Sequence, residues 1–410
     1  MAKKMLFLFV LLLSLTGMLK AQVTTAGMSG KVMADEESVI GATVVAVHEP
    51  SGTSYGTVTN VDGRFSLQGM RSGGPYKVTV SYIGYQTAIY TGIQLQLGET
   101  YSLNVTLHEA SELLGEITIT ASKSKFSAEK TGATTNISSE QLTTLPSINR
   151  SISDFTRISP YASGNSFGGR DGRSNTFTVD GANLNNNFGL SSGLPGGGNP
   201  ISLDAIDEVQ VVIAPYDVRQ ANFIGAGINA ITKSGTNAYR GSAYMYFNNE
   251  VMRGNKIGDT DFGARAEESK TVYGATFGGP IIKDKLFFFA NVEYEKSPQQ
   301  VITWRAAKEG ETPNNSTISR TTEADLAEFS QILKGKYGYN TGSFTDFPAD
   351  VTNLKLLGRI DWNINQGNKL SVRYNFTNNK TWEAPNGSSG NTGYRLAYNR
   401  VSAYSMSYAN

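Results

Sequence analysis

The amino-acid sequence predicts a mainly β protein with three structured parts: an N-terminal β-sandwich, a mixed α/β unit, and the first strands of a transmembrane β-barrel. Three observations support this fold class. The chain opens with an export signal, its first quarter consists of short alternating strands separated by turns, and the region after residue 235 contains longer segments in which apolar and polar residues alternate. Segments of about ten residues with a two-residue period are typical of membrane-spanning strands.

The composition of the 410-residue chain fits many strands joined by turns, because it includes 44 glycines and 20 tyrosines. We expect no long amphipathic helix. Charged residues make up only 17% of the chain and its net charge is +1, so no overall field favours nucleic acid or an acidic partner. The chain has no cysteine, which excludes disulfide bonds, thiolate metal sites, a cysteine nucleophile and lipid attachment to an N-terminal cysteine.

Residues 1–21 have the pattern of a secretory signal peptide. Lys3 and Lys4 form a positive start, and an unbroken apolar run covers residues 5–15. This run is too short to span a bilayer, which needs about 20 residues, and Ala21 provides a small residue for cleavage. The alternative is an uncleaved membrane anchor. Since no other stretch is long and apolar enough for a membrane helix, membrane insertion of the mature chain would require a closed barrel.

Residues 22–110 are expected to form the β-sandwich. Their short alternating segments are separated by turns, and Asp62-Gly63 is a dipeptide that favours a tight hairpin turn. The predicted strands cover residues 30–33, 41–48, 54–59, 64–67, 76–82 and 101–108. The apolar side chains expected to face the core are Val44, Val45, Val47, Val78, Val80 and Tyr82.

A linker is expected over residues 111–138. Within it, Ile117 and Ile119 alternate with threonines, which favours an extended strand. The polar span 123–140 should be mobile, because it has too little apolar surface to fold alone. A strand-forming segment on a flexible tether is what a partner needs in order to add a strand of its own.

The mixed α/β unit is expected over residues 139–235. Short helices should begin at Ser139 and Ser151, where a serine can cap the first turn. An Asn/Gly-rich loop covers 183–199, and a short helical turn is expected from Ala205 to Val209. The predicted strands cover residues 175–179, 209–214 and 225–233, with a turn at Asp180-Gly181.

Residues 236–410 alternate between an apolar and a polar face, as expected for strands with lipid outside and a wet lumen inside. A water-soluble sandwich is the alternative, but the export signal and the preceding unit favour the barrel. A plugged barrel needs about 22 strands, whereas this region holds about six to eight. The chain is therefore expected to be a fragment that forms an open, curved sheet. The clearest strands cover 239–247, 286–295, 354–364 and 370–377, with a short periplasmic turn at Lys283-Asp284-Lys285.

Several stretches are similar to known families. GKVMADEESVIGATVVAV at 30–47, TVTNVDGRFSLQGM at 57–70 and YKVTVSYIGYQT at 76–87 resemble the carboxypeptidase regulatory-like domain, a transthyretin-like sandwich with a carbohydrate-binding-like fold. That resemblance implies a shape and does not imply sugar binding.

A second resemblance concerns the rest of the chain. TFTVDGANL at 176–184, AIDEVQVV at 205–212 and GAGINAITKSG at 225–235 resemble, in this order, motifs of the plug domain of TonB-dependent receptors. TFGGPIIKDKLFFFANVEYEK at 276–296 resembles the start of the barrel in Oar-like receptors of the Bacteroidetes type. The resemblance implies that the mixed unit is a plug inside the barrel.

The same resemblance implies two sets of functional residues. The candidate TonB box, just before the plug, consists of Glu116, Ile117, Thr118, Ile119, Thr120 and Ala121. Its alternative is an ordinary interdomain strand. The candidate ligand-facing residues of the plug loops are Arg170, Asp171, Arg173, Asn183, Asn185, Asn186 and Phe188. Arg170 and Arg173 could instead pair with acidic groups on the barrel wall.

The function implied by the resemblance is transport or reception of an external ligand at the outer membrane of a Gram-negative, Bacteroidetes-type cell. A TonB-type inner-membrane energy transducer would pair with the TonB box and remodel the plug by force. The alternatives are an Oar-like barrel with a structural or adhesion role and a periplasmic carbohydrate-binding module. The expected partners are the transducer, outer-membrane lipid and an external oligosaccharide, peptide or protein; nucleic acid is not expected.

No enzyme activity, cofactor or metal site is expected. The stretch GLSSG at 189–193 matches G-x-S-x-G, but a hydrolase of that type has its histidine after the serine, and the only histidines are His48 and His108. The glycines at 196–198 are not followed by the Lys-Ser/Thr pair of a phosphate-binding loop. Two separate histidines do not make a metal site.

Overall fold

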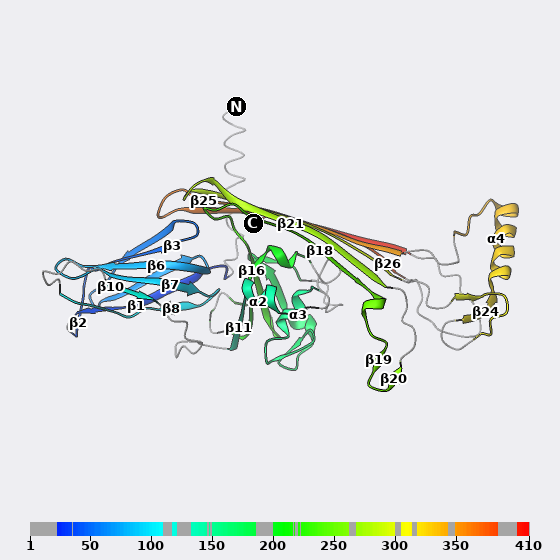
Figure 1. Cartoon of the computed structure of the whole chain (residues 1–410), viewed down its shortest axis with the longest axis horizontal. Helices are drawn as coiled ribbons and strands as arrows, with labels where there is room; N and C mark the ends of the chain where they lie inside the picture. Colours follow the sequence, from blue (N-terminus) through cyan, green and yellow to red (C-terminus); the bar gives the residue numbers. More distant parts are fainter. Residues whose placement is uncertain are drawn as a thin grey trace, which may run out of the picture.

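The computed structural model arranges the chain in three parts that follow one another along the sequence (Figure 1). The fold class expected from the sequence is confirmed: a sandwich, a mixed unit and an open sheet of long strands. The proposed signal peptide lies outside the described residues. The structure describes residues 23–34, 36–109, 117–120, 133–145, 147, 150–185, 200–215, 217, 220–221, 223–261, 268–299, 305–313, 318–342, 349–383 and 400–409.

The N-terminal sandwich has two five-stranded sheets that enclose one apolar core. Met28 from the first sheet and Val44, Tyr76 and Val78 from the second are fully buried in this core. The first sheet contains β1 (Ala26–Ala34), β2 (Glu37–Ser38), β5 (Arg64–Met70), β8 (Thr100–Ser102) and β9 (Val105–Leu107). The second has the order β10 (Ile117–Thr120), β7 (Ala88–Leu95), β6 (Gly73–Ser81), β3 (Thr43–His48) and β4 (Thr53–Val58).

Two expectations for the sandwich were incorrect. Val45 and Val47 are only half-buried, because side chains alternate across a strand and Val44 already faces the core. Strand β7 was not predicted at all. Gly92, with φ +78°, lies where the register between β6 and β7 shifts, so the apolar residues of β7 do not follow a simple two-residue period.

The central unit (residues 133–232) is built on one five-stranded sheet with two short helices beside it. Ser138 and Ser151 cap these helices, each in a capping box. The sheet has the order β11 (Ala133–Ser138), β16 (Ile206–Ala214), β17 (Gly227–Thr232), β14 (Thr176–Val179) and β15 (Ala182–Asn183). The remaining elements are α2 (Ser139–Thr144), α3 (Ile152–Thr156), β12 (Ala162–Ser163), β13 (Ser166–Phe167), η2 (Gly172–Ser174) and η3 (Leu203–Ala205).

Two boundaries of the central unit differ from the prediction. Residues 133–138, expected in a mobile linker, form β11 and pair antiparallel with β16. Polar composition did not prevent this strand from forming, because its partner β16 is mostly buried and supplies the apolar surface. The helical turn expected at 205–209 ends at Ala205, and residues 206–209 already belong to β16.

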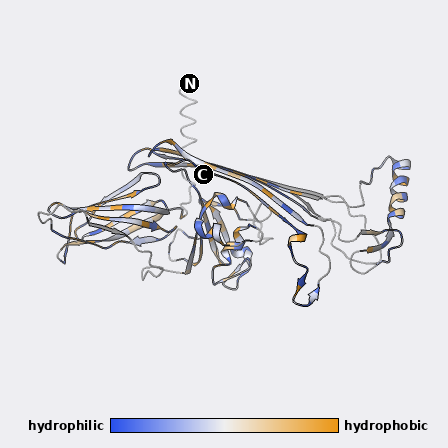
Figure 2. Ribbon diagram, in the orientation of Figure 1, coloured by the Kyte–Doolittle hydropathy of each residue, from blue (hydrophilic) through white to orange (hydrophobic). Residues whose placement is uncertain are grey.

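The large sheet has six antiparallel strands, each paired with the next long strand along the chain, and lies across one side of the central unit (Figure 1). Apolar and polar residues are interleaved along its strands (Figure 2). The turn at 283–285 joins its second and third strands, as predicted. The strands are β18 (Arg240–Asn249), β21 (Ser269–Ile282), β22 (Leu286–Gln299), β25 (Ala349–Asn363), β26 (Lys369–Glu383) and β27 (Arg400–Ala409).

One helix of 15 residues, α4 (Glu323–Tyr337), is present, but it is not amphipathic. Thr322 and Asp325 form a capping box at its start, and Gly338 ends it with φ 64°. Only Leu326 of this helix is buried, so its sequence lacks the apolar stripe that predicts a helix. None of the described helices is long and apolar enough to cross a membrane. Smaller elements near α4 and between the long strands are η4 (Glu250–Met252), β19 (Lys256–Ile257), β20 (Thr260–Asp261), β23 (Arg305–Ala307) and β24 (Ile318–Thr322).

Candidate functional site at the junction of the three parts

The large sheet turns its polar face toward the central unit and leaves its apolar face exposed. The alternation predicted for 286–295, 354–364 and 370–377 is confirmed by burial. Buried polar residues on the inner face are Asn291, Glu293, Asn353, Lys355, Arg359, Asp361, Asn375, Thr377 and Asn379. Exposed apolar residues on the outer face include Val292, Tyr294, Leu356, Ile360, Trp362, Leu370, Val372 and Tyr374. An apolar outer face with a polar inner face is the arrangement of a membrane barrel wall.

A buried ion pair joins this inner face to the central unit. Lys355 Nζ lies 2.8 Å from Glu293 Oε1, and both side chains are almost fully buried. Ser202 of the central unit donates its hydroxyl to Glu293 Oε2 at 2.8 Å, and Tyr244 donates to the same oxygen at 2.9 Å. A buried charge pair is tolerated only when such additional hydrogen bonds satisfy it. Glu293 therefore fixes the central unit against the large sheet.

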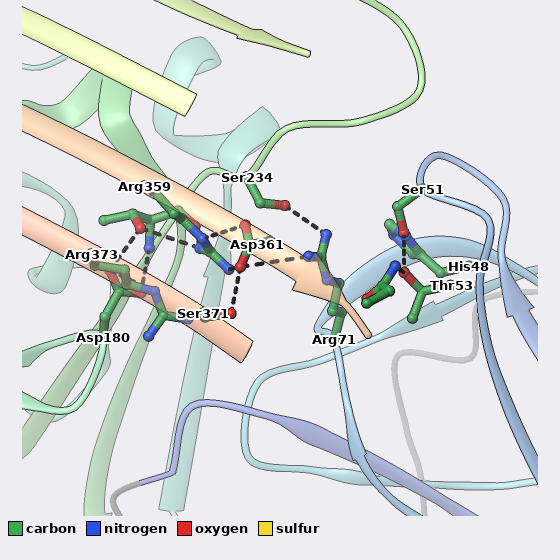
Figure 3. Close-up of polar contacts among 12 residues, drawn as sticks. His48, Ser51, Thr53, Arg71, Asp180, Ser234, Arg359, Asp361, Ser371 and Arg373 are labelled. Carbon is green, nitrogen blue, oxygen red and sulfur yellow. Dashed lines mark hydrogen bonds and ion pairs between the residues drawn. The ribbon is translucent and has the colours of Figure 1, made fainter. Parts of the chain in front are cut away.

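Asp361 links the sandwich to the large sheet (Figure 3). Its side chain is buried and receives two hydrogen bonds from Arg359, at 2.8 and 3.0 Å, within strand β25. Arg71 of the sandwich reaches the same carboxylate, with Nη2 3.6 Å from Oδ1, and donates to Ser234 Oγ at 3.0 Å. Ser371 of β26 also donates to Asp361. One carboxylate thus binds groups from the sandwich and from two strands of the large sheet.

A second buried carboxylate, Asp180, links the central unit to the large sheet beside Asp361 (Figure 3). Its oxygens accept hydrogen bonds from the Thr232 backbone N–H at 3.0 Å and the Thr232 hydroxyl at 2.6 Å. Arg373 of β26 places Nε 3.6 Å from Asp180 Oδ2. Arg359 donates to the Thr232 carbonyl. The two carboxylates and the two arginines of the large sheet therefore form one continuous buried polar network.

The sandwich also contacts the turns at the end of the large sheet. Asn237 donates its backbone N–H to the Pro50 carbonyl at 2.8 Å, and Asn363 donates its side-chain N–H to Thr53 Oγ1 at 2.9 Å. Asp284, in the predicted turn, accepts from Asn237 Nδ2 at 2.6 Å. Lys369 Nζ lies 3.4 Å from the centre of the Tyr55 ring, a close cation–π contact. These contacts hold the sandwich at one end of the large sheet.

Glu208 of strand β16 forms the contact between the sandwich and the central unit. The Leu97 backbone N–H lies 3.1 Å from both carboxylate oxygens of Glu208, and Gln210 donates to the Leu97 carbonyl. Burial raises the pKa of Glu208 to about 7; the Leu97 N–H lowers it and the charge of Asp207 raises it further, but burial has the largest effect. The adjacent Gly98 has φ +70°, and a Cβ there would lie 2.7 Å from Gln210 Nε2.

The predicted TonB box is in part a β-strand, which we call the coupling strand (residues 117–120). It pairs in parallel with β7, with Ile117 opposite Ala88 and Thr120 opposite Thr91. Within the described residues, the coupling strand is the last strand of its sheet. Glu116 and Ala121 lie outside the described residues. The structure thus places this segment on the sandwich rather than on the central unit.

The predicted ligand-facing residues do not all share one environment. Arg170, Asp171, Arg173 and Asn183 are exposed. Arg173 Nε lies 2.9 Å from Asp171 Oδ1, an ion pair with a neighbour in its own loop. Asn185 is half-buried, and its side chain accepts from the Phe177 backbone N–H at 2.6 Å, which gives it a structural role. Asn186 and Phe188 lie outside the described residues.

The residues that connect the three parts were not identified from the sequence, although some of them have a recognisable sequence pattern. Arg359 and Asp361 carry a signal, because the alternation of β25 assigns both to the polar face. Arg71 and Leu97 carry none, since they lie in turns that follow strands of the sandwich. In the part of the chain that the structure describes, no three His, Asp or Glu side chains form a candidate metal site. The GLSSG stretch lies outside the described residues.

Two family models match parts of the chain. The carboxypeptidase regulatory-like domain matches residues 27–108, which are the N-terminal sandwich. The outer membrane beta barrel domain matches residues 231–309, which include the first three strands of the large sheet.

Among known proteins, the chain is similar to the TonB-dependent transporter Oar of Myxococcus xanthus, with 25% identity over 344 residues. That alignment covers 79% of this chain, which spans only 30% of the length of the relative. Among solved structures, the siderophore receptor PirA of Acinetobacter baumannii gives a TM-score of 0.40 at 19% identity, covering 64% of this chain and 34% of that one. The ferric enterobactin receptor of Pseudomonas aeruginosa gives 0.42 at 15% identity, covering 64% and 36%.

The domain matches and the two-faced large sheet define an outer-membrane protein with β-barrel strands. More specifically, the N-terminal sandwich matches the carboxypeptidase regulatory-like domain, and the chain is similar in sequence to the TonB-dependent transporter Oar.

Proposed function

We propose that the protein takes part in energy-coupled transport or reception of an external ligand at the outer membrane, with residues 139–235 as the plug. The observation that supports this best is the position of the coupling strand. It lies just before β11 in the chain, and β11 pairs with β16 of the central unit. The central unit in turn contacts the polar face of the large sheet, where Ser202 donates a hydrogen bond to Glu293. A pull on residues 116–121 would therefore reach the unit that fills the barrel lumen.

The partner in this proposal is an inner-membrane energy transducer of the TonB type. A partner of this kind would add a strand to residues 116–121, since extended peptides bind through main-chain hydrogen bonds to an exposed strand edge. The exposed residues Arg170, Asp171, Arg173 and Asn183 are proposed as contacts for the external ligand, an oligosaccharide, peptide or protein. Main-chain pairing requires few particular side chains, which fits the simple alternation of isoleucine and threonine at 117–120.

The test is a deletion of residues 116–121 in the full-length protein, with a matched deletion of residues 123–128, which shortens the same linker (residues 111–138) by the same length. The first deletion should abolish binding of the transducer's periplasmic domain and energy-dependent uptake from a panel of labelled oligosaccharides and peptides. Barrel assembly, measured by heat-modifiable mobility on gels, should be unchanged in both variants. If the first deletion leaves binding and uptake unchanged, import is the wrong function, and a structural or adhesion role follows.

A further inference from the structure

The coupling strand is held by the sandwich, which precedes it in the chain. Residues 117–120 pair with residues 88–91 of β7 over their whole length, in parallel register. Without the coupling strand, β7 would be the edge of its sheet, with a row of unpaired backbone N–H and C=O groups. The sandwich therefore provides the edge on which this short segment becomes a strand.

Only one side of the coupling strand is used by this pairing. The strand order of the sheet ends at β10, so among the described strands nothing pairs with its outer side. A strand has two hydrogen-bonding sides, and a partner strand can pair with the outer one while β7 keeps the inner one. The partner does not need to displace the coupling strand from the sandwich.

We propose that the N-terminal sandwich is a template that holds residues 117–120 as an ordered edge strand and presents its outer side to the strand of the energy transducer. This inference rests on the proposed function and identifies the surface at which that function is exerted. Four residues without support would lose their conformational freedom when the partner binds, which weakens binding. On the sandwich this freedom is lost before the partner arrives.

The sandwich itself is well anchored for this task. Arg71 reaches Asp361 of the large sheet, and the Leu97 N–H is bound by Glu208 of the central unit. Leu97 follows the end of β7 by only two residues, so β7, the strand that pairs with the coupling strand, is fixed at that end. A template attached to the receptor in this way keeps the coupling strand at a fixed place on the periplasmic side.

Because the natural chain has no cysteine, one engineered disulfide can lock the pairing. Thr91 and Thr120 are opposite each other in the register, and we choose the double variant T91C/T120C in the full-length protein. Thr79 lies on β6, beyond β7, so T79C/T120C is the matched control. Under mild oxidation the first pair should cross-link and the second should not. Failure of the first pair to cross-link would show that the coupling strand does not lie on β7.

The binding probe is the purified periplasmic domain of the TonB-type transducer from the same cell, added to the full-length protein in detergent. The template predicts that oxidised T91C/T120C binds this domain as tightly as the reduced form, or more tightly. If oxidation weakens binding by more than about threefold and reductant restores it, the strand must leave β7 to act, and the template is wrong while the proposed function stands. If the protein lacking residues 116–121 binds equally well, both proposals fail.

Discussion

Replacing Glu208 with glutamine should remove the pH dependence of the contact between the sandwich and the central unit. Burial raises the pKa of Glu208 from 4.5 to about 7, so the docked state binds a proton more readily than a state in which the carboxyl faces water. Between these two values the stability of the docked state falls as the pH rises. The loss is complete above pH 7 and amounts to about 3 kcal/mol, from about 1.4 kcal/mol per pH unit.

Glutamine at position 208 stays neutral and keeps a side-chain oxygen that can accept from the Leu97 N–H. The variant E208Q should therefore equal the natural protein near pH 5 and be more stably docked at pH 8, by up to about 3 kcal/mol or about two orders of magnitude in the opening equilibrium. The assay is hydrogen–deuterium exchange of residues 95–99 in the detergent-solubilised chain across this pH range, corrected for intrinsic exchange rates.

The matched control is E49Q, which removes an exposed carboxylate from the same sandwich. It should exchange like the natural protein at every pH. The reasoning is refuted if protection of residues 95–99 in the natural protein is constant or rises from pH 5 to pH 8, or if E208Q follows the same curve as the natural protein.

Three further predictions concern buried charges. Burial, with a smaller effect from Arg71, lowers the pKa of His48 from 6.5 to about 4. The free energy of unfolding of the sandwich, measured with denaturant, should therefore fall by up to about 3 kcal/mol as the pH falls through this range. The variant H48Q should not show this loss. The exchange D361A leaves the buried Arg359 without its carboxylate and should cost about 3–5 kcal/mol of stability, whereas D361N should cost less. In detergent unfolding, E293A should destabilise more than the double change E293M/K355M, because the single change leaves the buried Lys355 with only the more distant carboxylate of Glu295, at 3.9 Å. Equal losses would contradict this.

The strands of the large sheet could be predicted because their pattern has a single cause. In β22, β25 and β26 one face is exposed and the other is buried, so apolar and polar side chains alternate along much of each strand. The alternation of isoleucine and threonine also predicted the coupling strand. Strand β7 was missed, because the register shift at Gly92 breaks the alternation, and so was α4, whose capping residues identify it better than its weak apolar pattern.

The contacts between the three parts could not be predicted from one sequence. Arg71 contacts Asp361, and Leu97 contacts Glu208, because the parts have complementary surfaces. No local sequence period records which turn faces which strand. The prediction that residues 133–138 belong to a mobile linker was wrong for the same reason. These residues are polar and form a strand because β16 lies beside them. The resemblance implied the coupling strand, but its place on the sandwich required the structure.

The arrangement around β16 determines where tension from the periplasm would be felt. A force applied to residues 117–120 would be transmitted along the backbone first to Ala133, which is paired with Ala214 at the C-terminal end of β16. The same force would also be transmitted through β7 of the sandwich to Leu97, which is hydrogen-bonded to Glu208 near the N-terminal end of β16. This interior strand of the central unit would thus be held at both of its ends, so that it would move as a whole and would not separate residue by residue.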